Sequence, residues 1–286
     1  MINVLLLLTV IFWGLSFIAT KMALQYLTPV EIIAIRLLLG APTLYLVVLI
    51  KKIEIKFKKV DYFILLVASV VLSLHFLIQA FGLQYTSATN TAWLVATIPV
   101  FIAILSALFL KERLSSFKIG GIALATFGVI LLVSGGKLTS LGSLHSVGDW
   151  IILSSSITWG VYTIITRNVT RTNNPLAVSL TILIVPTLFL NAYSAYTTPV
   201  SKILDLPINI IIALIFLGVF CLGLAHWFWL EGLSRKGATE VGVYIYIEPV
   251  VTTIVAIPLL NEQLTLFTIL GAALIIGGVY IVQKLW

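Results

Sequence analysis

A carboxylic acid, Glu248, stands inside a long apolar stretch of the sequence at residues 239–260. A helix rises about 1.5 Å per residue, so Glu248 lies about 14 Å into that stretch, near the middle of a hydrocarbon layer about 30 Å thick. An ionised acid at that depth costs roughly 2.5–3.5 kcal/mol on insertion scales, so such residues usually face the interior of a helical bundle. We expect Glu248 to line a cavity and to bind a cationic group or exchange a proton. The alternative is a structural hydrogen bond or ion pair.

Proline interrupts the helix at the same depth. Pro249 lacks a backbone N–H, which leaves the carbonyl of Ile245 without its helical donor. Irregular backbone within a bilayer must be buried in protein or line a wet cavity. Pro99 occupies the equivalent place in an earlier stretch, where Ile98 stands in place of the acid. We expect Pro99 and Pro249 to be helix breaks and flexible points.

Aromatic and polar residues gather at about the level of Glu248 and are the expected wall of a metabolite-sized cavity. Tyr244 precedes Glu248 by four residues, one helical turn, and is expected to share its face. Taken singly, the aromatic residues have a second interpretation, as packing residues or interface anchors. The candidate cavity residues are Trp13, Ser16, His75, Gln79, Asn90, Trp93, Thr97, Trp159, Tyr162, Tyr244 and Glu248.

A second charged candidate, Arg36, lies about 9 Å below the surface of its apolar stretch by the same helical rise. Three roles are open to it. Its side chain can extend outward to water, pair with Glu31, or bind the carboxylate of a substrate.

The elements that position these residues follow from composition. Of 286 residues, 60% are hydrophobic and 9% are charged, whereas soluble domains carry about 25% charged residues. Apolar stretches of about 20 residues span a bilayer as helices. We therefore predict an all-α integral membrane protein with ten transmembrane helices, at residues 3–25, 30–50, 61–83, 87–110, 117–135, 149–167, 176–197, 208–230, 239–260 and 265–283.

Basic residues predict the orientation. The net charge is +7, with 17 Lys and Arg. With ten spans, thirteen of them fall on one side of the membrane, including Lys51, Lys52, Arg113, Arg171 and Arg235. Cytoplasmic loops carry such an excess, so both termini are expected in the cytoplasm, with the chain in the plasma membrane. Membrane orientation explains the basic residues without a nucleic-acid partner.

The sequence also repeats itself. Trp13-Gly14 recurs 146 residues later, and from the third span onward the offset is 150. Each repeat holds an odd number of spans, so the two repeats, residues 1–135 and 149–286, must be inverted around a central cavity. Inverted repeats are common in secondary transporters; the alternative is that duplication only stabilised a bundle. The matching residues are Trp13-Gly14 with Trp159-Gly160, Lys21 with Arg167, Gly82-Leu83 with Gly232-Leu233, Pro99 with Pro249, Glu112-Arg113-Leu114 with Glu262-Gln263-Leu264, and Phe117, Gly121 and Gly128 with Phe267, Gly271 and Gly278.

Taken in order, these motifs resemble the drug/metabolite transporter superfamily, in its EamA-type branch. The likeness rests on the repeated Trp-Gly pair, Lys21, Pro29 followed by Arg36, Pro99, the Leu110-Lys111-Glu112-Arg113-Leu114 segment, Glu248-Pro249, and Leu260-Asn261-Glu262-Gln263-Leu264. The resemblance implies ten helices, an inverted repeat, cytoplasmic termini, a central cavity, and transport, often export, of amino acids and related metabolites. It leaves the individual substrate open.

Two features of the sequence argue against an ATP-driven pump and a metal-dependent enzyme. The sequence lacks a Walker motif, and its three histidines, His75, His145 and His226, show no metal-ligand spacing. We therefore predict a secondary transporter, and not an enzyme, that moves small metabolites by alternating access. The expected substrates are amino acids or related compounds, and the expected direction is outward. Small solutes and the lipid bilayer are its expected partners, with no cofactor or metal. An intramembrane enzyme, a channel, and an uptake carrier for another solute are the alternatives, and the oligomeric state is open.

Overall fold

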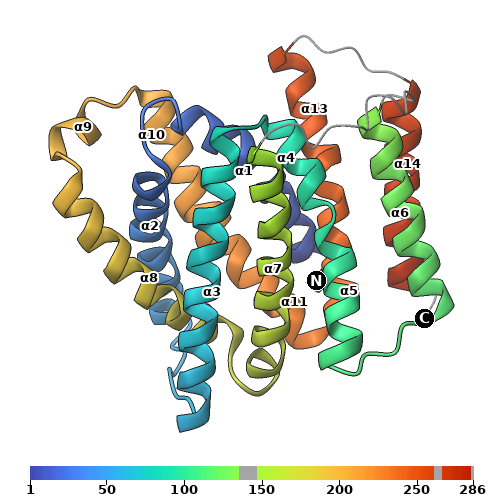
Figure 1. Ribbon diagram of the computed structural model, residues 1–286. Helices are drawn as coiled ribbons and strands as arrows, with labels where there is room; N and C mark the ends of the chain where they lie inside the picture. Colours follow the sequence, from blue (N-terminus) through green and yellow to red (C-terminus); the bar gives the residue numbers. More distant parts are fainter. Residues whose placement is uncertain (135–146, 261–265, 285–286) are drawn as a thin grey trace.

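The computed structural model describes residues 1–134, 147–260 and 266–284, and these are almost entirely helical, with no strand among them (Figure 1). The all-α class is confirmed. Within these described residues, seven helical segments are long and apolar enough to cross a membrane. They are α1 (Ile2–Ala23), α2 (Pro29–Ile50), α3 (Lys59–Gln84), α4 with α5 (Ala88–Phe109), α8 (Pro175–Thr197), α10 to α11 (Ile208–Arg235), and Ala238–Val255. The chain is therefore a multi-pass membrane protein, and the count of ten spans stays a prediction.

Helix α7 (Val147–Thr172) lies outside those seven segments because of its composition. Many of its polar residues are nonetheless buried in the protein, namely Asp149, Ser155, Ser156, Thr163, Thr166 and Thr170. Two further helices, α6 (Ser116–Ser134) and α14 (Leu266–Lys284), have shorter apolar stretches, and α9 (Val200–Leu204) is a single short turn.

Three of the long segments are broken within their length. One consists of α10 (Ile208–Ile215), a π-helix, η2 (Phe216–Leu224), and α11 (Ala225–Arg235). Another consists of α12 (Ala238–Gly242), a 3₁₀ turn, η3 (Val243–Ile247), and α13 (Glu248–Leu260). The third breaks at Ala96 and Thr97, between α4 (Ala88–Val95) and α5 (Ile98–Phe109).

The break before Pro249 is satisfied locally. The N–H of Glu248 donates to the carbonyl of Ile245, the group that Pro249 leaves without an α-helical donor. The tighter i to i+3 bonding of a 3₁₀ turn therefore replaces the missing helical bond.

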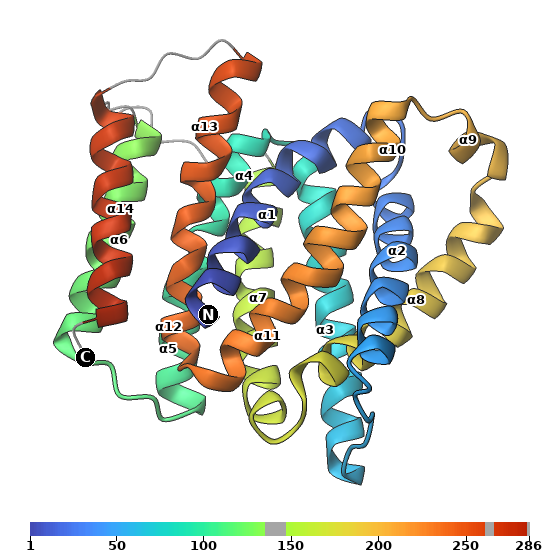
Figure 2. The same cartoon turned by 180° about the vertical axis from the view of Figure 1, so that it is seen from behind.

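Glycines bring α6 and α14 into direct backbone contact, and the two helices lie side by side at one edge of the bundle (Figures 1 and 2). A Cβ on Gly121 would lie 2.8 Å from the carbonyl oxygen of Gly278, and a Cβ on Gly128 would lie 2.8 Å from that of Gly271. Small residues allow such close approach where lipid provides no hydrophobic drive for association. In the 150-residue repeat Gly121 corresponds to Gly271 and Gly128 to Gly278, so the contact is reciprocal.

The Trp-Gly pairs also make matching contacts. A Cβ on Gly14 would lie 3.0 Å from the carbonyl oxygen of Glu248, so α1 packs directly on α13. A Cβ on Gly160 of α7 would lie 3.4 Å from Cβ of Phe101 in α5. The first helix of each half thus packs against the proline-containing segment of the other half.

Substituting Gly121 with Ala should destabilise the protein, because the added methyl group meets backbone that cannot move aside. Overpacking of this kind typically costs about 1–3 kcal/mol. Gly120→Ala is the matched control, since a Cβ there meets no atom within 4 Å. Thermal unfolding of the purified variants in detergent should show a lower midpoint for Gly121→Ala than for Gly120→Ala; equal midpoints would contradict this packing.

Candidate functional site

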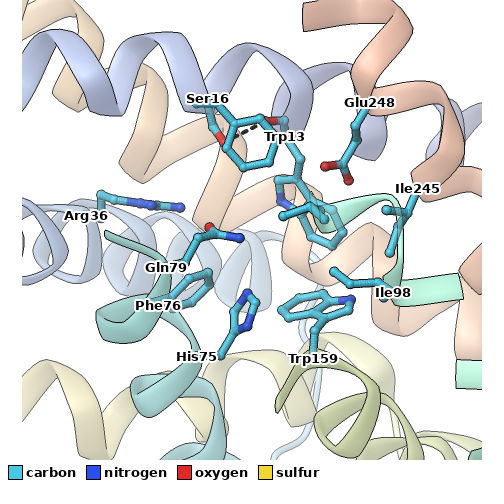
Figure 3. A pocket seen from close by; sticks show the side chains of 12 residues that line it. Trp13, Ser16, Arg36, His75, Phe76, Gln79, Ile98, Trp159, Ile245 and Glu248 are labelled. Carbon is cyan, nitrogen blue, oxygen red and sulfur yellow. Dashed lines mark hydrogen bonds between the residues drawn. The ribbon is translucent and has the colours of Figure 1, made fainter. Parts of the chain in front are cut away.

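A cavity lies in the interior of the bundle, where α1, α2, α3, α4, α5, α7, η3 and α13 meet (Figure 3). The spaces between its lining side chains, including the part open to solvent, total about 360 Å³. Both halves of the chain contribute to it. Its lining residues are Trp13, Ser16, Phe17, Arg36, His75, Phe76, Gln79, Val95, Ile98, Trp159, Ile245 and Glu248.

The structure brings many of the residues singled out from sequence to this cavity, namely Trp13, Ser16, Arg36, His75, Gln79, Trp159 and Glu248. Sequence reasoning missed Phe17, Phe76, Val95, Ile98 and Ile245. They are apolar residues in apolar helices, and nothing in the sequence separates those that face a cavity from those that face lipid or protein.

Two charged side chains point into the cavity from opposite sides (Figure 3). Glu248 is 2% exposed and Arg36 is 5% exposed. Neither side chain has a hydrogen bond or ion pair with any residue of the described ranges, and the buried Nε of Arg36 has no acceptor. The guanidinium carbon of Arg36 lies 5.0 Å from the ring centroid of Phe76, close enough for a cation–π contact.

Two of the three roles open to Arg36 are wrong. Its burial excludes an outward extension to water. Arg36 does not pair with Glu31. The carboxylate of Glu31 instead accepts hydrogen bonds from Lys202 Nζ at 2.7 Å, from the hydroxyl of Thr198 at 2.9 Å and from the backbone N–H of Thr28 at 2.7 Å. Contact of Arg36 with a substrate stays a prediction.

Aromatic rings in contact with one another form part of the cavity wall. Trp13 and Trp159 meet edge to face with centroids 5.0 Å apart, and the indole N–H of Trp13 donates to the carbonyl of Cys221 in η2 at 3.0 Å. The Trp159 ring also lies 4.8 Å from that of His75. The Trp-Gly pair of each half therefore supplies a ring to the cavity and a glycine to the packing behind it.

His75 is held by its Nδ1, which lies 3.0 Å from the carbonyl oxygen of Ser155 and 3.1 Å from the hydroxyl of Thr158. A carbonyl oxygen can only accept a hydrogen bond, so Nδ1 carries the proton. In the neutral ring Nε2 is then an acceptor, and it has no hydrogen-bond partner among the described residues.

Asn90, Trp93 and Thr97 do not line this cavity. The amide of Asn90 donates to Asp149 at 2.6 Å, and the hydroxyl of Thr97 donates to the carbonyl of Leu94 at 2.6 Å. The indole nitrogen of Trp93 is buried without a partner in the described chain.

Tyr244 also lies outside the lining, and the reason is local geometry. The expectation that Tyr244 shares the face of Glu248 assumes an α-helix, but residues 243–247 form a 3₁₀ turn. In a 3₁₀ turn residues three apart are eclipsed, so Ile245 takes the place beside Glu248. The assumed face was wrong by one residue.

Tyr162 belongs to a separate buried network that sequence reasoning missed. Its hydroxyl lies 2.5 Å from Nε2 of His226, and the hydroxyl of Ser179 lies 2.6 Å from Nδ1 of the same ring. A serine beside a histidine is also the arrangement of a nucleophile and its base. Here Ser179 and His226 are both buried, and neither lines the cavity. The network that they form with Tyr162 links α7, α8 and α11.

A network at the end of the bundle where α5 and α12 meet (Figure 2) joins the two halves. The Glu112 carboxylate accepts from the backbone N–H of Thr239 at 3.1 Å and from its hydroxyl at 2.6 Å, so Glu112 caps the first turn of α12. Lys118 pairs with Glu240 at 3.1 Å. Burial alone raises the pKa of the Glu112 carboxyl, but hydrogen bonds from Thr239 and Ser106, with the charge of Lys118, lower that pKa below its usual value. Its counterpart, Glu262, lies outside the described residues.

The opposite end has its own network. Lys21 Nζ donates to the carbonyls of Leu83 at 2.8 Å and Thr86 at 2.6 Å, where α3 ends. Asp149, at the start of α7, accepts from the hydroxyl of Thr86 at 2.7 Å. The cavity therefore lies between two polar closures, each tying one half to the other. No cluster of metal-ligating side chains occurs in the part of the chain that the structure describes.

The chain belongs to the EamA-like transporter family, whose profile matches residues 1–134 and again 146–283. An uncharacterised transporter of Archaeoglobus fulgidus is 30% identical over 98% of this chain and 96% of its own. A probable amino-acid metabolite efflux pump of Escherichia coli is 28% identical over 98% of this chain and 93% of its own. A solved crystal structure covers 99% of this chain and 97% of its own with a TM-score of 0.78 at 17% identity, which shows a shared fold.

Cysteine labelling can test the 3₁₀ turn. In a Cys221→Ser background, Ile245→Cys should react with a small, water-soluble thiol reagent in isolated membranes, because residue 245 lines the cavity. Tyr244→Cys should stay unreacted, because Ile245, and not residue 244, faces the cavity. Labelling is measured by mass spectrometry of the purified variants, and the reverse pattern would mean that an α-helix runs through this segment.

Proposed function

We propose that this protein is a secondary transporter of small metabolites that works by alternating access, with ten helices in two inverted repeats around the cavity. The observation that carries the proposal is the cavity itself, a space between the helices of a transporter-family member that charged, polar and aromatic residues from both halves line. The two matches to the family profile, residues 1–134 and 146–283, agree with the proposed division.

Reciprocal contacts support the inverted repeat. Gly121 packs on Gly278 as Gly128 packs on Gly271, the arrangement expected of two equivalent helices related by a two-fold axis. The hydropathy of α7 understates its membrane character, because its buried serines and threonines lie within the protein rather than in lipid. We therefore count α6, α7 and α14 as spans alongside the seven apolar segments.

The helix breaks suit a change between two conformations. Residues 93–97 and 243–247 are equivalent in the 150-residue repeat, and both precede a proline. Val95 and Ile98 border one break and line the cavity, as Ile245 and Glu248 do at the other. A change of backbone angle at Pro99 or Pro249 would reshape the cavity wall and move the two closures relative to each other.

The proposed direction and substrate class come from a relative. The Escherichia coli relative is described as a probable amino-acid metabolite efflux pump, and we propose the same direction and a related substrate class here. The basic connections, such as those at residues 51–59 and 110–115, favour cytoplasmic termini in the plasma membrane. Glu248 and Arg36 are the candidate groups for substrate binding or charge coupling.

Metabolite profiling tests the function directly. Cells that express the protein should enrich their medium in a small set of amino acids or related compounds, relative to cells with empty vector. Glu248→Gln at matched membrane abundance should reduce the enrichment, since the variant loses the cavity's carboxylate. An unchanged profile for Glu248→Gln would contradict a role for that residue in transport, and uptake of the same compounds would reverse the proposed direction.

A second prediction follows from alternating access. In the Cys221→Ser background, Ser16→Cys should be labelled by a membrane-impermeant thiol reagent from either side of the membrane, in right-side-out and in inverted vesicles. Ser16 lines the cavity, so it faces each side in turn. Labelling from only one side in both the presence and the absence of exported metabolites would contradict alternating access.

A further inference from the structure

A second hollow lies at one end of the bundle, apart from the central cavity. It forms where α1 begins, α2 ends, α8 begins and α11 passes, and Figure 2 shows the start of α1 beside α11. The spaces between its lining side chains, including the part open to solvent, total about 780 Å³. The two hollows share no lining residue, so they are separate features of the protein.

The end of α2 brings a lysine to this hollow. The N–H of Ile53 donates to the carbonyl of Val48 at 3.0 Å, the bond that closes a Schellman turn after a helix. Lys52 lies at the turn with a φ of 51°, in the left-handed region that glycine usually occupies there. Lys51 and Ile53, on either side of it, both line the hollow. Nζ of Lys51 lies 5.4 Å from the ring centroid of Trp227, within the range of a cation–π contact.

The charges of the hollow do not cancel. Among the described side chains that line it, Lys51 and Arg235 are cationic and Glu231 is anionic. Nε of Arg235 donates to the carboxylate of Glu231 at 2.9 Å, and a second guanidinium nitrogen bonds to the same oxygen. Lys51 has no ion pair with a residue of the described ranges. Arginine and glutamate therefore offset each other, and the positive charge of Lys51 is left over.

A further donor stands at the start of α8. The side-chain oxygen of Asn174 accepts from the backbone N–H of Leu176 at 3.0 Å and so caps the helix. The amide nitrogen of Asn174 has no acceptor in the part of the chain that the structure describes. An amide donor and an unpaired lysine beside the positive end of a helix dipole favour a phosphate group.

The other side of the hollow is apolar and continues along the bundle. Leu5 and Phe228 line it, and Leu5 shares a face of α1 with Phe12, two helical turns further on. The ring of Phe12 packs on those of Phe216 and Phe220 in η2, with centroids 6.1 and 5.6 Å apart. Phe220 is 39% exposed. A small anion would leave this surface uncovered, whereas a hydrocarbon chain would lie along it.

We propose that this hollow binds a phospholipid of net negative charge. The phosphate lies at Lys51 and Asn174, and an acyl chain follows Leu5 and Phe12 into the bilayer. Basic pockets between transmembrane helices on the cytoplasmic side bind anionic headgroups, and the orientation proposed above places this end of the bundle in the cytoplasm. A choline headgroup carries a positive charge of its own, which Lys51 would repel.

Lipid titration of the purified full-length protein in a neutral detergent tests the proposal. Palmitoyl-oleoyl phosphatidylglycerol and palmitoyl-oleoyl phosphatidylcholine have the same acyl chains, and native mass spectrometry gives the affinity for the first bound lipid. Phosphatidylglycerol should bind about fivefold more tightly, the effect of about one basic residue at an anionic headgroup. Thermal unfolding in the presence of sodium glycerol phosphate distinguishes a lipid site from a free-anion site, since this probe has no acyl chain and should give no stabilisation.

Three variants test the charges. Lys51→Gln should abolish the preference for phosphatidylglycerol. Glu231→Gln should strengthen it, because Arg235 is then no longer offset. Lys56→Gln is the matched control: it removes the same charge from the same connection after α2, but Lys56 pairs with Glu54 and does not line the hollow. Opposite effects of removing a cation and an anion cannot come from a loss of folding.

Several results would overturn the site. These are equal affinity of the parent for the two lipids, equal effects of Lys51→Gln and Lys56→Gln, or weaker binding by Glu231→Gln. Stabilisation by glycerol phosphate as large as that by phosphatidylglycerol would overturn the assignment to a lipid and indicate a free-anion site. All these measurements report binding, so they stand or fall independently of the proposed transport function.

Discussion

A bilayer gives no hydrogen bonds, so every polar group at its centre must be satisfied by the protein or by what the protein binds. The described chain meets this requirement at most positions within itself. Serine and threonine hydroxyls bond back to helix carbonyls, as Thr9 does to Leu5, and buried acids have donors around them. The requirement is left unmet at a few buried groups elsewhere, such as the indole nitrogens of Trp93 and Trp229, and in the cavity, where Glu248, Nε of Arg36 and the indole N–H of Trp159 have no hydrogen-bond partner in the described structure.

The same constraint explains the shape of the broken helices. Proline removes a donor, and in lipid the orphaned carbonyl would cost several kcal/mol. The 3₁₀ turn at Val243–Ile247 restores that bond, and in doing so it rotates Ile245 rather than Tyr244 toward Glu248. One missing N–H therefore determines both where the helix can bend and which side chain borders the acid. The glycines at Gly14 and Gly160 then let the first helix of each half approach the broken segment of the other.

The all-α membrane class, the helix breaks at the two prolines and the main polar residues of the cavity were predictable from sequence, because each can be recognised from residue type and position alone. A charged residue, a tryptophan or a proline stands out within an apolar stretch of sequence. The apolar lining was not predictable, because Phe17 and Phe76 look like any other residue of their helices. Tyr244 was misplaced because an α-helical period was applied across a 3₁₀ turn. The Tyr162–His226–Ser179 network was missed because its members lie on three helices whose contacts no local pattern specifies.

The two halves share a scaffold but differ in the charged residues that they contribute to the cavity. Both halves provide a Trp-Gly pair, a broken segment and a proline, so the scaffold can be understood as one unit used twice. Glu248 has Ile98 as its counterpart, and Arg36 also belongs to one half only, since its second-half equivalent at the offset of 146 is Ile182. Two inverted units with identical residues would surround a ligand symmetrically, with like charges opposed. An acid in one half and a base in the other instead make the two sides of the cavity chemically different, although the scaffold around them is repeated.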